Sequence, residues 1–287
     1  MTKLDPKYEE LQSIYDISNE FFELFLGPTM GYTCSYFERD DMTLDEGQNA
    51  KFDLALGKLG LQPGMTLLDI GCGWGHGMQR ALENYDVNVV GLTLSERQRD
   101  YAIAKLAKVP TQRTVEVRLQ GWEEFDDQVD RIVSIGAFEH FGHERYPAFF
   151  EMAHNALPDD GRMLLHTITA VKMSEAKELG LALTFEKARF AKFIMTEIFP
   201  GGQLPSVALV EEHATKAGFI LGQEQAIGRL YYPRTLREWA ANLERNREEA
   251  IAAQSQEMYD RYMKYLTGCV ELFVDGYTNV HQFTLQK

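Results

Sequence analysis

The sequence predicts one α/β domain built on a mostly parallel sheet with helices on both faces. Three observations support this fold class. Short apolar segments alternate with helix-length amphipathic segments between residues 66 and 169. A glycine-rich loop directly follows the first of these apolar segments. The chain of 287 residues is 45% hydrophobic, which is enough for a sizeable core, and it contains no repeat, low-complexity segment or linker.

The region before the alternating pattern is predicted to be partly helical. Ser18 is a candidate N-cap for a short helix that runs to Leu26 and ends at Gly27-Pro28. Residues 29–45 have an irregular pattern. A second, amphipathic helix is expected over 44–59, because Gly60 and Pro63-Gly64 follow it.

The alternating region predicts five strands, with helices between most of them. The strands are expected at 66–70, 87–94, 114–120, 129–135 and 161–169. A helix follows the first strand, another covers 95–108, and helical material precedes residue 157. Parallel strands need such crossover connections, so this order favours helices on both faces of the sheet.

After residue 170 the alternation breaks. Residues 172–199 are mostly helical, a helix is expected over 206–217, and a sixth strand over 219–227. A long helical stretch, 235–273, is interrupted near Gln254-Ser255, and a closing strand covers 279–286. We therefore expect a single domain, 1–287, with a helical insertion at about 171–217 that covers the mouth of the sheet.

Charge and cysteine content exclude several classes of protein. The net charge of −14 and the pI near 5.0 argue against general nucleic-acid binding, which depends on Lys and Arg. No apolar run is long enough to cross a bilayer, and the first ten residues do not resemble a secretory signal. The three scattered cysteines form neither a disulfide framework nor a metal site. We expect a soluble cytoplasmic protein without a metal.

The strongest local signal is the segment LLDIGCGWG at 67–75, where a strand ends in an acid before a glycine loop. Such a loop lets a ligand lie against the backbone. Binding of a dinucleotide is disfavoured because His76 stands where the last glycine of G-x-G-x-x-G is expected, and because the second strand has no terminal acid. S-adenosylmethionine (SAM) fits better, although a turn that only packs the helix on the strand remains an alternative.

Several long blocks, read together, resemble the mycolic acid cyclopropane synthases, which are related to bacterial cyclopropane-fatty-acid synthases. These blocks are LLDIGCGWG, VDRIVSIGAFEHFGHERY, MLLHTIT, FIMTEIFPGGQLPS and YMKYLTGC, and the similarity runs from about Tyr15 to the C-terminus. The resemblance implies a class I SAM-dependent methyltransferase fold with a seven-stranded sheet. It also implies a SAM site, in which Thr33 stands where the family often has Ser. The implied residues are Tyr32, Thr33, Leu67, Leu68, Asp69, Ile70, Gly71, Cys72, Gly73, Trp74, Gly75, Thr93, Leu94, Ser95, Glu96, Arg97, Gln98, Trp122 and Glu123.

The resemblance further implies cyclopropanation of a cis double bond in a long meromycolic-type acyl chain, with a bound bicarbonate as base. The implied catalytic residues are Glu139, His166, Tyr232, Cys34 and Cys269, with backbone amides near the two cysteines. Taken alone, each has a simpler explanation, since free cysteines are usually small buried hydrophobes and a histidine in an apolar strand is usually a core residue.

The sequence leaves alternatives open for the product and for the placement of the substrate. Intact GAFEHF and LLHT blocks favour ring closure over a methyl-branched or hydroxylated product, and a small-molecule methyltransferase is a further alternative. The family commonly has His where this chain has Tyr231, and Pro233 follows Tyr232, so the loop that carries Tyr232 is expected to differ in shape.

The insertion is apolar enough to line an acyl tunnel and carries basic side chains suited to an acidic acyl carrier protein, with peripheral membrane contact as another option. The candidate tunnel residues are Leu179, Leu181, Leu183, Phe185, Phe190, Phe193, Ile194 and Phe199, and the basic residues are Lys172, Lys177, Lys187, Arg189 and Lys192.

Overall fold

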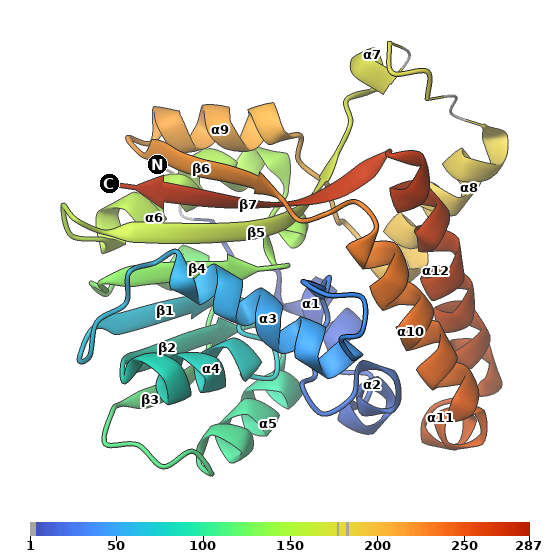
Figure 1. Ribbon diagram of the computed structural model, residues 1–287, viewed down its shortest axis with the longest axis horizontal. Coiled ribbons are helices and arrows are strands. Elements are labelled where there is room, and N and C mark those ends of the chain that lie inside the picture. Colours follow the sequence, from blue (N-terminus) through green and yellow to red (C-terminus); the bar gives the residue numbers. More distant parts are fainter. Residues whose placement is uncertain (1–3, 177, 182–183) are drawn as a thin grey trace.

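A seven-stranded sheet forms the centre of the computed structural model (Figure 1), which describes residues 4–176, 178–181 and 184–287. The strand order is β3-β2-β1-β4-β5-β7-β6. The strands are β1 (Thr66–Ile70), β2 (Asn88–Thr93), β3 (Val115–Leu119), β4 (Arg131–Ile135), β5 (Arg162–Ala170), β6 (Ile220–Ala226) and β7 (Thr278–Gln286).

Strands β1 to β5 are mutually parallel, whereas β7 runs antiparallel to both β5 and β6. The strand order reverses beside β1, which has β2 on one side and β4 on the other. Ligands of open α/β sheets bind outside the carboxyl ends of the strands at such a switch point. The predicted strand positions and the mostly parallel sheet are confirmed.

Helices cover both faces of the sheet because side chains of the parallel strands are apolar on both sides. In β1, Leu67 belongs to a buried cluster with α3 (Leu44–Gly57) and α4 (His76–Tyr85), while Leu68 and Ile70 belong to a second cluster with α6 (Tyr146–Ala156) and α9 (Val207–Lys216). The helix α5 (Glu96–Leu106) contacts β3 and β2. Helix α9 is therefore part of the layer that covers the sheet, and the expected insertion is shorter than 171–217.

A third buried cluster lies beyond the carboxyl ends of the strands, at the right of Figure 1. It joins α2 (Asn19–Leu26) to α10 (Tyr231–Arg245), α11 (Arg247–Ala253) and α12 (Gln256–Asp275), and it includes Phe193 at the end of α8 (Phe185–Phe193). The helices between β6 and β7 therefore cover the mouth of the sheet together with the insertion. The remaining elements are α1 (Tyr8–Tyr15), α7 (Met173–Ala176), a π-helix η4 (Ile194–Ile198) and the 3₁₀ turns η1 (Trp122–Glu124), η2 (Phe138–His140) and η3 (His143–Arg145).

Capping side chains place several helix starts where the sequence predicts them. The hydroxyl groups of Ser18, Ser95, Ser206 and Ser255 each accept a hydrogen bond from a backbone N–H in the first turn of the following helix. The break near Gln254-Ser255 is confirmed, since α11 ends at Ala253 and α12 begins at Gln256.

One local prediction is wrong. Tyr232 does not lie in a loop, because α10 begins at Tyr231 and includes Pro233 in its first turn. Proline is tolerated there, since the first N–H groups of a helix have no partner within the helix. The Tyr231 ring packs edge-on against Tyr36 and Phe37, at centroid distances of 5.5 and 6.0 Å, which anchors the start of the helix.

Candidate active site

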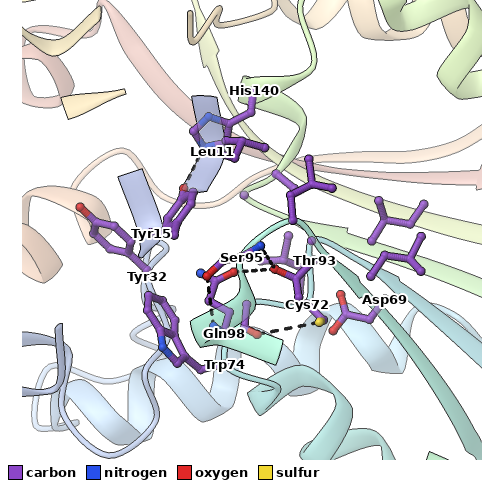
Figure 2. A pocket seen from close by; sticks show the side chains of 18 of the residues that line it. Leu11, Tyr15, Tyr32, Asp69, Cys72, Trp74, Thr93, Ser95, Gln98 and His140 are labelled. Atoms are coloured by element: carbon purple, nitrogen blue, oxygen red, sulfur yellow. Dashed lines mark hydrogen bonds between the residues drawn. The ribbon is translucent and has the colours of Figure 1, made fainter. Parts of the chain in front are cut away.

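A cavity opens beside the glycine loop at the carboxyl end of β1, and we call it the glycine-loop cavity (Figure 2). Its walls come from the β1, β2 and β4 ends, from the turn at Trp122 and from the N-terminal segment. Of the residues that the sequence assigns to SAM, it is lined by Tyr32, Thr33, Asp69, Ile70, Gly71, Cys72, Gly73, Trp74, Thr93, Leu94, Ser95, Gln98, Trp122 and Glu123.

The three glycines of the loop have different surroundings. All three have positive φ angles of 77°, 54° and 81° at Gly71, Gly73 and Gly75, which L-residues rarely adopt. A Cβ on Gly71 would lie 2.3 Å from Cβ of Ala137, and one on Gly75 would lie 3.0 Å from Cβ of Ala102. A Cβ on Gly73 would meet no atom within 4 Å. Two glycines therefore allow close packing, and the third leaves backbone open to the cavity.

Polar side chains follow the ends of β1 and β2. The Thr93 hydroxyl donates to Gln98 Oε1 over 2.8 Å and accepts from the Ser95 N–H over 3.2 Å, and these bonds fix the start of α5 (Figure 2). Burial raises the pKa of the Asp69 carboxyl to about 7. Such a carboxyl is expected to seek a hydrogen-bond donor or a positive charge from a ligand.

Five of the assigned residues do not line this cavity. Leu67 and Leu68 are fully buried in the two sheet clusters, and Gly75 packs against α5. Glu96 and Arg97 are exposed on the outer side of the first turn of α5. All five residues were assigned because they lie within continuous motifs of the family that the sequence resembles. A continuous motif, however, directs only some of its side chains toward a site.

Tyr15 and His140 are among the lining residues that the sequence analysis missed. The Tyr15 hydroxyl and His140 Nε2 lie 2.8 Å apart, and both residues border the cavity (Figure 2). Burial lowers the pKa of His140 to about 4, so the ring is neutral near pH 7. Because His140 directly follows Glu139, its position next to a predicted catalytic acid is the signal that could have identified it.

A second, largely apolar cavity lies on the other side of Tyr32 and Thr33, and we call it the acyl-shaped cavity. Tyr15, Tyr32, Thr33, Gly136 and His140 line both cavities and form their shared wall. The structure brings all five predicted catalytic residues to the acyl-shaped cavity, which is lined by Cys34, Glu139, His166, Tyr232 and Cys269.

Glu139 is 8% exposed and lies in the turn after β4. Its Oε1 accepts a 2.6 Å hydrogen bond from the Ile168 N–H, while Oε2 is buried without a hydrogen-bond partner among the described residues. Burial raises the pKa of Glu139, and the Ile168 N–H opposes part of that shift. An unpaired buried carboxylate oxygen is costly, so Oε2 is suited to a ligand that donates a hydrogen bond.

His166 and Tyr232 remain neutral at physiological pH. Burial lowers the pKa of His166 well below its ordinary value, and the nearby cations Lys51 and Lys58 lower it further. Burial raises the pKa of the Tyr232 hydroxyl well above its ordinary value. A neutral imidazole and a protonated phenol can both donate hydrogen bonds to an anion.

Both cysteines are buried, and burial raises the pKa of each thiol, that of Cys34 to about 12. Cys34 lies in a segment outside any helix or strand. Cys269 lies within α12, where each backbone N–H group donates a hydrogen bond to the carbonyl group four residues earlier in the helix. The helix therefore does not support the expectation that the amide of residue 269 binds an anion.

The predicted tunnel residues divide into three groups. Ile194 and Phe199 line the acyl-shaped cavity, together with α12 residues that the tunnel prediction did not include. Leu179 and Phe185 are 62% and 82% exposed, so their assignment to the tunnel is wrong. Phe190 packs near Gly268, Phe193 is buried in the third cluster, and Leu181 does not line the cavity. Leu183, like the basic residue Lys177, lies outside the described residues.

No helix within the described ranges is long and apolar enough to cross a membrane. The same ranges contain no group of three His, Cys, Asp or Glu side chains placed to hold a metal ion.

Comparisons with known proteins agree with the geometry. Residues 2–283 match the family described as mycolic acid cyclopropane synthetase. The S-adenosylmethionine-dependent methyltransferase UmaA of Mycobacterium tuberculosis (strain ATCC 25618 / H37Rv) is 63% identical, with both chains covered completely. The structure of the cyclopropane synthase MmaA2 from Mycobacterium tuberculosis superposes with a TM-score of 0.98 at 57% identity, again over all of both chains.

A second solved structure shows what such a protein binds. The mycolic acid cyclopropane synthase CmaA1, complexed with SAH and CTAB, has a TM-score of 0.96 and 60% identity, with 99% of each chain covered. The match over nearly the whole chain supports SAM, rather than a dinucleotide, as the cofactor. The chain therefore belongs to the mycolic acid cyclopropane synthetase family and is a SAM-dependent methyltransferase of that type.

Proposed function

We propose that the protein transfers a methyl carbon from SAM to a cis double bond of a long acyl chain and closes a cyclopropane ring. The observation that carries this proposal is the shared wall of Tyr15, Tyr32, Thr33, Gly136 and His140 between the two cavities. It lets a cofactor on the polar side and an alkyl chain on the apolar side meet directly. The CTAB in the CmaA1 complex, a detergent with a long alkyl chain, supports an alkyl ligand here.

The glycine-loop cavity fits the cofactor. Gly73 leaves room for close approach, and the partly protonated, buried Asp69 can bond a polar ligand group. The rings of Tyr15, Tyr32 and Trp74 line the same space, and aromatic faces stabilise a nearby cation such as a sulfonium. When bound, SAM supplies the electrophilic methyl group.

The reaction needs a base only after the alkene has attacked the methyl carbon. The C–S bond breaks with its electrons on sulfur, a cation forms on the neighbouring alkene carbon, and loss of a proton from the new methyl group closes the ring. We propose that bicarbonate, when bound, supplies the base that takes this proton. Glu139 Oε2 would accept from its hydroxyl, and His166 and Tyr232 would donate to its other oxygens.

The apolar walls would protect the cationic carbon from water. The product of the reaction distinguishes ring closure from capture of the cation by water. We expect incubation of a cis-unsaturated acyl substrate with labelled SAM to add one CH2 unit with loss of the alkene signal in the mass spectrum. A gain of a methyl and a hydroxyl group, or a methyl branch, would contradict cyclopropanation.

The acid is tested by Glu139→Gln. We expect turnover to fall about 10³-fold, because a glutamine amide has only one acceptor oxygen and cannot replace both oxygens of the carboxylate. SAM affinity measured by calorimetry should stay unchanged. The matched control is Glu144→Gln, an exposed acid in the next turn of the same segment, which should keep parental activity. Cyclopropane formation by Glu139→Gln at the parental rate would contradict this arrangement.

We also propose that the acyl chain arrives on an acyl carrier protein in the cytoplasm. Exposed basic side chains at Lys172, Arg189 and Lys192 support this, since acidic partners are steered by complementary charge. Lys187 is less suitable, because its Nζ forms a 2.6 Å ion pair with Asp275.

A further inference from the structure

A row of polar side chains crosses three strands and reaches His166 from within the sheet. His166 on β5 is paired with Gln282 on β7, and Gln282 is paired with Gln225 on β6. Gln282 is fully buried, and its Nε2 lies 3.3 Å from His166 Nδ1. At the end of α3, Lys58 Nζ donates to Gln282 Oε1 over 2.7 Å and to Gln225 Oε1 over 2.6 Å.

The donor chemistry fixes the direction of each bond in this row. An ammonium group has hydrogens to donate and no lone pair to accept. Burial lowers the pKa of Lys58 to about 8, so the group is still mostly charged at pH 7. The Gln282 amide must therefore turn its oxygen toward Lys58, and its NH2 group then points to His166. Nδ1 of His166 must accept that bond.

A neutral imidazole has one N–H, so acceptance at Nδ1 places the proton on Nε2. We propose that Lys58 and Gln282 are positioning residues that hold His166 in the Nε2–H tautomer, so that it presents a hydrogen-bond donor to the acyl-shaped cavity. The role of this donor in catalysis rests on the proposed function. The tautomer itself does not, because it follows from the contacts of Lys58, Gln282 and His166.

A merely structural role for Gln282 would predict a different response. In a purely structural role, the bond from Lys58 would satisfy the amide, and replacement of Gln282 would change stability without moving the ring proton of His166. Only the positioning role requires that a change of amide to carboxylate moves the ring proton. In Gln282→Glu both oxygens are acceptors, so Nδ1 of His166 must become the donor to the new carboxylate.

The test is nitrogen-15 NMR of the histidine rings, which distinguishes a ring nitrogen that carries a proton from one that does not. His166→Gln identifies the signals by their disappearance. We expect the parent protein to show Nε2–H with unprotonated Nδ1, and Gln282→Glu to show a protonated Nδ1. Gln225→Met is the matched control, because Gln225 shares Lys58 but does not contact His166, and it should leave the tautomer unchanged.

A second pair of variants covers the case in which Gln282→Glu does not fold. Lys58→Met removes the group that orients the amide, so the ring should populate both tautomers, and Lys58→Arg should restore the Nε2–H form because it is again only a donor. We expect Lys58→Met to lower kcat about 10- to 100-fold without changing the KM for SAM. Loss of a group that orients a histidine through hydrogen bonds has an effect of this size in metal sites.

Two results would overturn the inference: a parent protein whose His166 carries its proton on Nδ1, or a tautomer that Gln282→Glu and Lys58→Met both leave unchanged. Failure of the proposed function would look different. The Nε2–H tautomer would be present in the resting protein and would respond to the variants, but no alkene would be cyclopropanated.

Discussion

Gly71, Gly73 and Gly75 lie within five residues of one another, yet their missing side chains serve different ends. The first and third allow Ala137 and Ala102 to approach the loop, and only Gly73 faces open space. Gly73→Val should therefore abolish SAM binding in a protein that still folds, with a cost of roughly 2 kcal/mol for a β-branched residue at the positive φ of 54°. Calorimetric titration measures this affinity.

The control for this loop is Gly71→Ala. Its Cβ would meet that of Ala137 at 2.3 Å, so the expected defect is lower stability rather than a specific loss of cofactor. A folded Gly73→Val protein with parental SAM affinity would show that the cofactor does not approach the loop at this residue.

Cys269→Ser should retain substantial activity. Burial raises the pKa of the Cys269 thiol, so no thiolate is available near neutral pH, and the alkene itself is the nucleophile in the proposed reaction. Serine is close to cysteine in size. The measurement is the initial rate at saturating SAM with added bicarbonate. A rate below about one thousandth of the parent, or roughly 4 kcal/mol in the barrier, would reveal a chemical role for the sulfur.

Lys51 gives the stability of the protein a predictable pH dependence. It is fully buried, and its Nζ donates to Thr33 Oγ1 and Gln48 Oε1 beside the shared wall. Burial lowers the pKa of Lys51 from 10.5 to about 7. Between these values the unfolded chain holds a proton that the folded protein has released, so a rise in pH favours the folded state.

The comparison with Lys51→Met isolates this effect. From pH 7 to pH 9, the free energy of unfolding of the parent should rise relative to that of the variant by about 2 kcal/mol. Urea unfolding at the two pH values measures the difference. If the difference in the free energy of unfolding between parent and variant stays constant over this range, folding does not lower the pKa of Lys51.

At the level of single residues, the sequence predicts identity better than orientation. The structure places the predicted catalytic residues Glu139, His166 and Tyr232 at one cavity. The sequence also assigns Glu96 and Arg97 to the cofactor because they lie in the same motif as Ser95 and Gln98, but both are exposed and neither lines the glycine-loop cavity. Which side of a helical turn faces a ligand depends on how the helix packs, and the spacing of a motif does not contain that information.

Elements with strong local signals were predictable, whereas their tertiary partners were not. Ser18, Ser95 and Ser255 mark helix starts because a hydroxyl cap acts within one turn. Pro233 was misleading, because proline ends helices in their interior but begins them in the first turn. The contribution of α12 to the acyl-shaped cavity depends on tertiary contacts with α10 and with η4, and η4 is distant from α12 in sequence.

The contact between α8 and α12 offers a test of the cavity wall. A Cβ on Gly268 of α12 would lie 2.3 Å from the Phe190 ring of α8. Gly268→Ala should displace this ring and change the KM for the acyl substrate, while SAM affinity is unaffected. The helix itself should tolerate the change, since alanine favours a helix by about 1 kcal/mol over glycine. Thr267→Ala, on the exposed neighbouring position, is the control.

If Gly268→Ala changed neither the KM nor the range of chain lengths accepted, α8 would not form a wall against the substrate. A loss of SAM affinity would instead show that the two cavities are mechanically coupled through α12.

In the molecule as a whole, the sheet with its flanking helices can be predicted from the sequence, whereas the arrangement of the helices over its mouth cannot. The sheet and the helices on its faces follow from alternating strands and crossover helices, whose chirality and packing obey general rules. The covering of its mouth follows no such rule. It is assembled from α2, near the N-terminus, and from α8 and α10 to α12, in the second half of the chain, which meet in one buried cluster (Figure 1).

Because Tyr15, Tyr32, Thr33, Gly136 and His140 border both cavities, the wall between them has a consequence for steady-state kinetics. Direct transfer across it needs both ligands in place at once, and no enzyme side chain carries the methyl group in between. Double-reciprocal plots at several fixed concentrations of the second substrate should therefore intersect. Parallel lines are the signature of a covalent enzyme intermediate, and they would require the methyl group to rest on the protein after the first product has left.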